Sequence, residues 1–452
     1  MLTSLHVNPA LARRAEQQAL RRESQLRCAR GAALQWFNSD ARGQAPRALV
    51  FYHYLHPDDV VSSLLFTELC AGLRERGWQV IAVSCNRGCR NEAVAYPPDS
   101  VWQGVRIHRI WRPSIPQSTR LGRLFNSAWM ILAWSSLAFR RKASPDLLVV
   151  GTDPVLSILV ARPWKLVRPA TRIVHWCFDL YPDAAVAEGL IRPNHPLVRV
   201  LRAALASAYR ACDLIVDIGC CMRERLLAYR SPGRHVTLTP WALAEPTEPL
   251  PRYSEERNRL FGDARLALLY SGSFGRAHCH EEILALARQM RPANARFVFS
   301  VRGNRVEALR SSVTEQDDNI SFVPFASQDN IEARLGAADV HMVSLRQEWT
   351  GTVVPSKFFG SLAVGRPVLF AGSADSAIAR WIREHNVGWI LTTENTGTVA
   401  EELKSLSESP EQLISLFSRC HQVYQRHFSK QQMLDRWHTE LTTLLNGRRQ
   451  SN

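Results

Sequence analysis

Short apolar runs alternate with amphipathic stretches along most of the chain. Several runs, such as LLVVGT at 147–152, are almost continuously apolar, which is typical of strands buried on both faces of a sheet. The stretch at 62–76 has the apolar spacing of a helix and is followed by Gly77. This alternation predicts parallel sheets covered by helices. The first series of predicted strands comprises Arg47–Leu55, Trp78–Cys85, Val105–Trp111, Asp146–Thr152, Thr171–Cys177, Cys212–Gly219 and His235–Trp241.

A Pro- and Glu-rich stretch, PWALAEPTEPLPRYSEER at 240–257, separates this series from a second one. The chain has 452 residues, more than one hydrophobic core usually supports, so we expect two domains. The predicted fold class is α/β, with two facing Rossmann-like domains built on parallel sheets. The second series of predicted strands comprises Ala267–Ser273, Arg296–Gly303, Ile320–Phe325, Val340–Arg346, Pro367–Gly372 and Gly388–Thr393.

These patterns predict a domain organisation with five segments. A basic helical extension at 1–45, with a helix over 9–37, precedes the N-terminal domain. Terminal helices at the other end are expected to pack back on the N-terminal domain. The expected boundaries are 1–45 for the extension, 46–240 for the N-terminal domain, 241–258 for the linker, 259–409 for the C-terminal domain and 410–452 for the terminal helices.

The chain is strongly basic, with 56 Lys and Arg against 41 Asp and Glu and a net charge of +15. Such an excess favours anionic partners such as phosphates, acidic lipid surfaces or nucleic acid. No basic motif with interleaved aromatic residues supports nucleic acid. The ten cysteines form no paired C-x-x-C motif, which argues against zinc and favours a reducing compartment. Cys177 and Cys212 lie in apolar runs and are expected in the core.

One uncharged run, the 16 residues Leu124–Phe139, bears on membrane contact. A membrane-spanning helix needs about 20 apolar residues, so this run is too short. Residues 1–45 carry arginines but lack the apolar region of a signal peptide. Basic residues flank Leu124–Phe139, and two interpretations stay open: a buried helix, or a segment resting in the headgroup region of an acidic membrane. We expect a cytoplasmic protein bound peripherally to the inner face of the plasma membrane.

The motif YSGSFGRAH at 270–278 follows an apolar strand and precedes the helical stretch EEILALARQM. Gly272 and Gly275 would let the backbone turn tightly and approach a ligand. The helix N-terminus would offer N–H groups to a phosphate, and Arg276 would add a bidentate cation. The alternative is a plain strand–helix turn.

The motif VVPSKFFGSLAVGRPVLF at 353–370 places Lys357 in the first turn of a predicted helix. A cation there opposes the helix dipole, which is explained if Lys357 pairs with a phosphate. The alternative is a solvated surface lysine.

Two further motifs supply polar candidates at strand ends. In WCFDLYPD, Asp179 follows a strand and would bind a substrate hydroxyl or act as a base. His175 is one alternative, and a helix N-cap role for Asp179 or Asp183 is another. In HYLHPDDVVSS, His56, Asp58 and Asp59 would line a cleft, unless the motif is only a turn in which Ser62 caps a helix. His278 and His280 of HCHEE would point to different helix faces, so no metal site is expected.

VPSKFFGSLAVGRPV and YSGSFGRAH resemble the donor-site helix and the phosphate loop of retaining glycosyltransferases of the large family-4 group, which have the B-type double-Rossmann fold. The segment 322–345 is similar to the stretch that connects these two motifs in that group. HWCFDLYPDAAVAEGL and the chain from YHYLHPDDVVSS to GTDPVLSILV also resemble it. The resemblance covers roughly 47–445 and is greatest to the branch that builds bacterial exopolysaccharide and O-antigen.

The resemblance implies transfer of a sugar from a nucleoside-diphosphate sugar to a lipid-linked or polysaccharide acceptor, without cofactor or metal. Arg276 and Lys357 would hold and neutralise the diphosphate, the backbone at 351–353 would face the sugar hydroxyls, and Arg302 with the turn at 323–325 would lie near the base. Asp179, Lys357 and Arg276 are the catalytic candidates. The donor-binding candidates are Gly272, Ser273, Gly275, Arg276, Arg302, Val323, Gly351, Thr352, Val353, Ser356 and Lys357.

The sequence also departs from the family pattern. The group often carries two glutamates at the positions of Thr352 and Gly360, and neither residue replaces a carboxylate. Glu348, four residues before Thr352, is a candidate substitute. Two alternative functions therefore stay open: a nucleotide-sugar epimerase of the same fold, and a non-catalytic binding scaffold.

Overall fold

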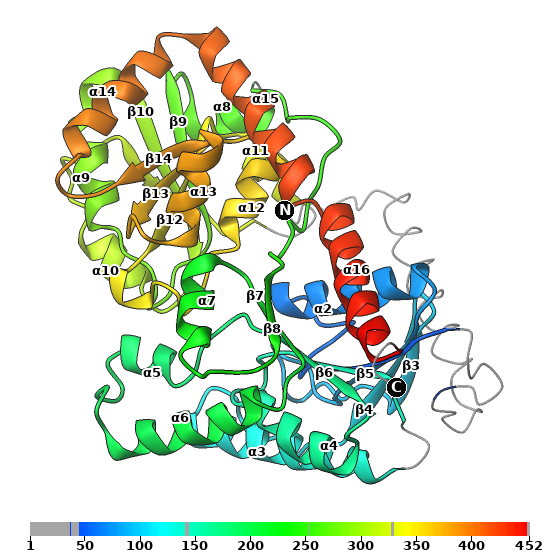
Figure 1. Ribbon diagram of the computed structural model, residues 1–452. Helices are drawn as coiled ribbons and strands as arrows, with labels where there is room; N and C mark the ends of the chain where they lie inside the picture. Colours follow the sequence, from blue (N-terminus) through cyan, green and yellow to red (C-terminus); the bar gives the residue numbers. More distant parts are fainter. Residues whose placement is uncertain (1–36, 38–44, 141–143, 253, 327–329, 450–452) are drawn as a thin grey trace, which may run out of the picture. The chain divides into compact units, whose positions relative to one another are not determined.

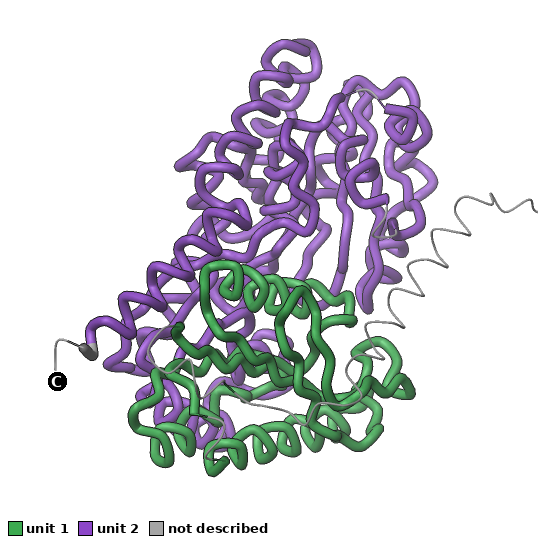
Figure 2. The backbone as a smooth tube through the Cα atoms, turned by 90° about the vertical axis from the view of Figure 1, so that its right-hand side faces the viewer, with its two compact units in different colours: residues 1–173 green, residues 174–452 purple. Residues whose placement is uncertain are grey.

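The computed structural model describes residues 37, 45–140, 144–252, 254–326 and 330–449, and the chain forms two compact units, 1–173 and 174–452 (Figure 2). The helix expected over 9–37 lies almost entirely outside the described residues. The domain boundary expected near residue 240 falls within the second unit and stays a prediction.

The first unit contains a mostly parallel sheet with the strand order β3-β4-β2-β1-β5 (Figure 1). Only β3 is antiparallel to its neighbour, β4. Every strand predicted in this unit is present, whereas β3 was not predicted because this short edge strand is only partly buried and carries no buried apolar pattern. The strands are β1 (Arg47–Phe51), β2 (Gln79–Cys85), β3 (Asp99–Trp102), β4 (Val105–Ile110) and β5 (Leu147–Val150).

Helices cover both faces of this sheet because successive side chains of β1 point in opposite directions. Tyr52, just after β1, stacks on Phe66 of α2 (Val61–Glu75), with ring centroids 4.0 Å apart. Phe51 stacks on Trp134 of α3 (Arg120–Ser136) at 5.1 Å. It also meets Trp164 of α4 (Ala161–Val167) edge-on at 5.6 Å.

The second unit begins within β6 (Arg172–Trp176), which pairs in parallel with β7 (Leu214–Asp217), and β7 with β8 (Arg234–Thr237). A separate six-stranded parallel sheet has the order β11-β10-β9-β12-β13-β14. This is the strand order of a dinucleotide-binding Rossmann sheet. The order in which strands are added reverses between the first and the fourth strand, here β9 and β12. Its strands are β9 (Leu266–Ser273), β10 (Ala295–Arg302), β11 (Ile320–Phe322), β12 (Val340–Leu345), β13 (Val368–Gly372) and β14 (Gly388–Leu391).

Alternation along β9 places two helical layers on this sheet. Leu266, Leu268 and Tyr270 belong to a core with α9 (Glu281–Gln289), α10 (Val306–Ser311) and α14 (Thr396–Ser407). Ala267 and Leu269 belong to a second core with α8 (Glu255–Phe261). A strand buried on both faces explains its continuously apolar sequence.

The remaining helices complete the second unit. The predicted terminal helical stretch is two helices, and in the second of them Trp437 packs edge-on against Trp176, 5.0 Å between ring centroids. Among the described residues, no helix has both the length and the apolarity needed to cross a membrane. These helices are α5 (Asp183–Ala187), α6 (Pro196–Tyr209), α7 (Cys220–Leu227), α11 (Ile331–Gly336), α12 (Lys357–Ala363), α13 (Ala377–His385), α15 (Pro410–His427) and α16 (Lys430–Arg449).

Candidate active site

The loop after β9 is fixed to the end of β12, at the point where the strand order of the six-stranded sheet reverses. The Arg346 backbone N–H donates to the Ala277 carbonyl at 2.8 Å. His278 Nδ1 lies 2.8 Å from the Ser344 carbonyl oxygen, and the Tyr270 hydroxyl 3.3 Å from Ser344 Oγ. Ligands of open α/β sheets bind beyond the strand ends at this reversal point, so the geometry makes this loop a candidate binding site.

Lys357 is the first residue of α12, as predicted, and its side chain runs over Gly272. A Cβ atom at Gly272 would lie 2.7 Å from Lys357 Cε, and the backbone there has φ +134°. The lysine Nζ lies 5.3 Å from the centre of the Tyr270 ring. Glycine at 272 is therefore required twice, by the backbone conformation and by the lysine.

Lys357 is partly buried, and no acidic partner for it is seen in the part of the chain that the structure describes. Burial lowers the pKa of Lys357 to about 8. Burial, together with the positive charge of Lys357, lowers the pKa of His278 to about 3, so this imidazole is neutral. The Ser344 carbonyl can only accept a hydrogen bond, so Nδ1 of His278 carries the proton and Nε2 is left as an acceptor. The loop thus holds one uncompensated cation beside a neutral histidine.

Arg276 forms an ion pair with Glu188, which was not singled out from the sequence. The arginine side chain is 45% exposed and the glutamate 22% exposed. A Cβ atom at Gly275 would meet nothing closer than Asn304 Oδ1 at 3.7 Å, so the surface above Gly275 is open. No local sequence signal connects Glu188 to Arg276, because the contact depends on how distant segments fold together.

The helical stretch EEILALARQM that was predicted after the Gly272–Gly275 loop is present as α9 (Glu281–Gln289). Strand β9 continues through Ser273, and α9 begins only at Glu281. Glu281 and Glu282 occupy its first turn. A connecting segment separates the loop from α9, and the expectation that this helix offers N–H groups to a phosphate stays a prediction.

Arg302 and the turn at 323–325 lie together, as the resemblance implies. The Arg302 guanidinium stacks 4.1 Å from the centre of the Phe325 ring, and the Val323 N–H donates to the Phe299 carbonyl at 3.0 Å. The Phe274 N–H donates to the Arg302 carbonyl at 2.7 Å, which joins this corner to the loop after β9.

The loop at 349–353 accepts hydrogen bonds from two residues of the same unit, Leu180 and Arg225. The Leu180 N–H donates to the Thr352 carbonyl at 3.1 Å, and Arg225 Nε donates to the Thr350 carbonyl at 2.9 Å. Gly351 has φ +77°, and a Cβ there would lie 2.5 Å from the Cys221 carbonyl oxygen. The Thr352 side chain is fully buried, and its hydroxyl has no hydrogen-bond partner among the described residues.

The neighbours of this loop are less enclosed. Val353 is partly buried, and Ser356 is exposed at the N-cap of α12, where its side chain makes no capping bond. Glu348, the candidate substitute for a missing glutamate, lies 3.7 Å from Arg346 and is exposed. At Gly360 a Cβ atom would meet nothing within 4 Å. Of the two glutamate positions of the family, Gly360 is thus sterically open and Thr352 is buried, and neither carries a carboxylate.

Asp179 is exposed where the chain leaves β6. The N-cap of the following helix, α5, is Pro182, and no side chain caps it. Asp183 lies in the first turn and pairs with Arg202 at 3.0 Å and with Arg225 at 3.5 Å. The interpretation of either aspartate as the N-cap was therefore wrong. His175 is buried beside Tyr209, ring centroids 5.7 Å apart, as strand alternation suggests.

In the first unit, His56, Asp58 and Asp59 have structural partners. Asp58 is buried and accepts from the Cys89 N–H at 2.8 Å and from the Tyr96 hydroxyl at 3.3 Å. Asp59 pairs with Arg90 at 2.6 Å. His56 stacks on Trp102, ring centroids 5.2 Å apart. The N-cap of α2 is Val60 rather than Ser62, since that helix begins at Val61.

His53 and Asp153, which the sequence analysis did not single out, form a pair at the carboxyl ends of the adjacent strands β1 and β5. His53 Nδ1 lies 3.3 Å from Asp153 Oδ1, and the imidazole is buried while the carboxylate is 40% exposed. Burial alone would lower the pKa of His53. Asp153 and Cys85 raise it by more than burial lowers it, so the pKa is about 9. Both residues follow apolar strands in the sequence, and this position is the one feature from which they could have been predicted as site residues.

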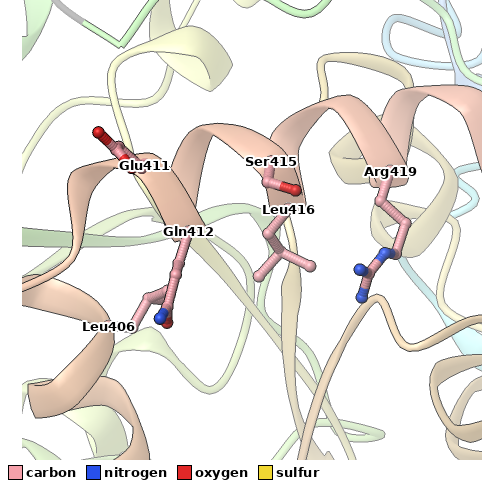
Figure 3. A pocket seen from close by; sticks show the side chains of 6 residues that line it. All are labelled: Leu406, Glu411, Gln412, Ser415, Leu416 and Arg419. Carbon is pink, nitrogen blue, oxygen red and sulfur yellow. The ribbon is translucent and has the colours of Figure 1, made fainter.

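No group of histidine, cysteine or acidic side chains within the described ranges is arranged to hold a metal ion. His280 Nε2 lies 3.0 Å from Ser312 Oγ, away from the His278 contact. Cys177 and Cys212 are buried, as expected. A surface hollow of about 480 Å³ lies along α15 and shares no residue with the loops above (Figure 3). Its lining residues are Leu406, Glu411, Gln412, Ser415, Leu416 and Arg419.

Comparison with known proteins identifies the chemistry that this fold carries. Residues 65–242 match the family described as a glycosyl transferase 4-like domain. The chain is 25% identical over 299 residues to the probable glycosyltransferase WbjE of Pseudomonas aeruginosa, covering 65% of this chain and 73% of that protein. It is 28% identical over 120 residues to the putative colanic acid biosynthesis glycosyl transferase WcaI of Escherichia coli, covering 26% and 30%.

A solved structure agrees with the fold. The complex of HepE from Anabaena with UDP-glucose superimposes with a TM-score of 0.58 at 12% identity, covering 88% of this chain and 99% of that one. The epimerase and scaffold alternatives gain no support from these relatives. Residues 65–242 are therefore similar to a glycosyl transferase 4-like domain, and the chain has the B-type double-Rossmann fold of known glycosyltransferases.

Proposed function

We propose that this glycosyltransferase moves a hexosyl group, with retention of configuration, from a nucleoside-diphosphate sugar to a lipid-linked or glycan acceptor in bacterial surface-polysaccharide biosynthesis. The observation that carries the proposal is Lys357, a partly buried lysine without an acidic partner in the described chain, lying over Gly272 at the strand-order reversal. The names of two relatives support it, since WcaI is described as acting in colanic acid biosynthesis and HepE binds UDP-glucose.

The proposed chemistry follows from where charge develops. As the bond between the sugar and the diphosphate breaks, negative charge accumulates on the diphosphate oxygens, and positioned cations stabilise it. Lys357 and Arg276 are the residues that we assign to this role. Because burial lowers the pKa of Lys357 to about 8, a bound diphosphate favours its charged form and raises that pKa again.

The sugar and the base are assigned to neighbouring loops. We place the sugar hydroxyls against the loop at 351–353, where the buried Thr352 hydroxyl lacks a partner among the described residues and suits a hydrogen bond to the sugar. We place the base beside the stacked pair Arg302 and Phe325. Gly272, Ser273 and Gly275 bring backbone N–H groups to the diphosphate. Val323, Val353 and Ser356 complete the proposed donor site.

The acceptor is assigned to three groups of polar residues. Asp179, exposed at the end of β6, is the proposed base or acceptor ligand. His56, Asp58 and Asp59 of the first unit belong to the proposed acceptor side, where Asp58 and Asp59 have structural partners of their own. The same unit offers the His53–Asp153 pair, whose carboxylate is partly exposed and suits a hydroxyl hydrogen bond.

A membrane surface is the proposed working place, because α3 exposes an apolar face. Leu121 is 81% exposed and Leu132 is 71% exposed, while Met130 and Trp134 on the opposite face are fully buried. Arg120 is the first residue of this helix, and Arg140 follows it. An exposed apolar stripe with cationic ends is suited to the headgroup region of an acidic bilayer. The exposed apolar residues of this segment are Leu121, Leu124, Phe125, Trp129, Leu132 and Phe139.

A transfer assay tests the proposed function. The full chain is incubated with UDP-, GDP- and ADP-sugars, with and without a lipid extract of bacterial membranes as the acceptor source. We expect acceptor-dependent release of one nucleoside diphosphate and retention of the anomeric configuration in the product. An isomerised sugar nucleotide without acceptor would instead indicate an epimerase. Neither release nor binding would indicate a scaffold.

A further inference from the structure

We propose that Glu188 is an internal counter-ion of the donor site: it holds Arg276 while the site is empty and gives it up to the donor diphosphate. This inference rests on the proposed donor site and adds a residue that competes with the ligand. It begins from the ion pair between Glu188 and Arg276, the arginine of the loop that follows β9.

The backbone holds Glu188 at this place. Glu188 follows α5, and its N–H donates to the Ala184 carbonyl at 2.9 Å. Gly189, with φ +75°, turns the chain immediately afterwards. The start of the same segment is tied to the loop at 349–353 by the bond from Leu180 to Thr352. The carboxylate is thus carried to Arg276 by a short helix whose preceding residues are tied to the loop at 349–353.

Among the cations assigned to the donor site, Glu188 pairs with Arg276 alone. Lys357 has no acidic partner in the described chain, and Arg302 stacks on an aromatic ring. Glu188 therefore neutralises one of the two cations assigned to the diphosphate and leaves the other free. A carboxylate and a phosphate bind guanidinium through the same N–H donors, so they compete for Arg276.

Competition has a defined consequence for affinity. Part of the free energy of donor binding is consumed in releasing Glu188, and a carboxylate that stays near the diphosphate repels it. Both effects weaken nucleotide binding, and both disappear when the carboxylate is neutralised. The pair is partly exposed, so its contribution is of the size measured for surface ion pairs.

Calorimetric titration of the full chain with UDP, GDP and ADP tests this. In Glu188→Gln, which keeps the side-chain shape, we expect the nucleotide that binds the wild type to bind about 2- to 5-fold more tightly. The matched control is Glu224→Gln, which removes a carboxylate paired with Arg380 at 3.1 Å on α7 and α13. It should leave the dissociation constant unchanged.

A double substitution separates a specific pair from a general charge effect. In an Arg276→Ala background, Glu188→Gln should no longer tighten binding, because the residue with which it competes is gone. Unchanged or weaker binding in Glu188→Gln alone would overturn the proposal, as would an equal gain with and without Arg276. A wild type that binds none of the three nucleotides would overturn the donor site itself, and this result is distinct from equal binding by wild type and variant.

Discussion

Lys357 lies directly over Gly272, so closely that a methyl group on Gly272 would come within 2.7 Å of the lysine Cε. The two residues belong to the two sequence motifs that resemble the family's donor site. They meet where β9 ends and α12 begins, beside the reversal of strand order. The contact joins the motifs into one site and makes the position of the cation depend on a glycine.

Gly272→Ala should reduce turnover strongly while the fold is kept. The added methyl group displaces the Lys357 side chain, and φ +134° is a conformation that alanine rarely adopts. Losing one positioned cation costs roughly 2–4 kcal/mol of transition-state stabilisation, or about 30- to 1000-fold in kcat/KM. The control is Gly360→Ala in α12, where nothing lies within 4 Å of the new Cβ. If Gly272→Ala is as active as Gly360→Ala, turnover does not depend on Lys357 lying over Gly272.

Donor affinity should fall as the pH rises above about 8. Only the protonated lysine attracts the diphosphate, and burial lowers the pKa of Lys357 to about 8, so the charge is present below that pH and is lost above it. Above the pKa the dissociation constant should rise by up to about tenfold per pH unit. Titrations between pH 7 and 9.5 check this. Lys357→Arg should remove the pH dependence, and a wild-type affinity that is flat up to pH 9.5 would rule out a titrating Lys357.

Arg276→Ala should also reduce turnover by about 30- to 1000-fold, since it removes the second cation assigned to the diphosphate. Melting temperature should change little, because the Arg276 side chain is partly exposed and its ion pair with Glu188 lies at the surface. Steady-state kinetics and thermal melting measure the two effects separately. Near-wild-type kinetics would remove Arg276 from the donor site.

Asp179→Asn should lower activity more than stability. Asp179 is exposed at the end of β6, and the N-cap of α5 is Pro182, so we assign the Asp179 carboxylate to the acceptor rather than to a helix cap. Asp183 lies four residues after Asp179 and provides the comparison. Asp183→Asn weakens the ion pairs to Arg202 and Arg225. We expect the Asp183 variant to shift the melting temperature more and the kcat less. The reverse order would show that Asp179 acts structurally.

The apolar face of α3 should bind acidic liposomes without spanning them. Replacing Leu124 and Leu132 together by Gln removes two exposed apolar side chains, each worth about 1.5–3 kcal/mol when fully buried. Liposome flotation should therefore fall by at least about tenfold, whereas Ile414→Gln, an exposed residue of α15, should have no effect. Added salt should release the fraction held by charge alone. Equal flotation of both variants would exclude α3 as the membrane contact.

Much of the fold could be predicted from the sequence because buried strands are continuously apolar. β9 and β12 show this, and both end at the residues that carry chemistry. The exposed edge strand β3 has no such signal. The α3 segment left two interpretations open, because its apolar residues suit either a core or a membrane, and only the structure shows that Leu121 and Leu132 are exposed.

The donor loops were also predictable, because Gly272 and Lys357 are marked by local turn and helix chemistry. The partners of these loops were not. Glu188 meets Arg276 through tertiary packing. Long-range pairs and exact element ends depend on the folded chain rather than on local pattern.

The most direct test of the central claim, a diphosphate site built on Lys357 and Arg276, is a thermal-shift screen over nucleoside diphosphates and their sugars. Ligands that bind only the folded state raise its melting temperature by mass action. We predict that at least one nucleoside diphosphate and its sugar stabilise the wild type, and that both shifts vanish in the Lys357→Ala, Arg276→Ala double variant. No shift with any nucleotide, or an equal shift in the double variant, would contradict the account.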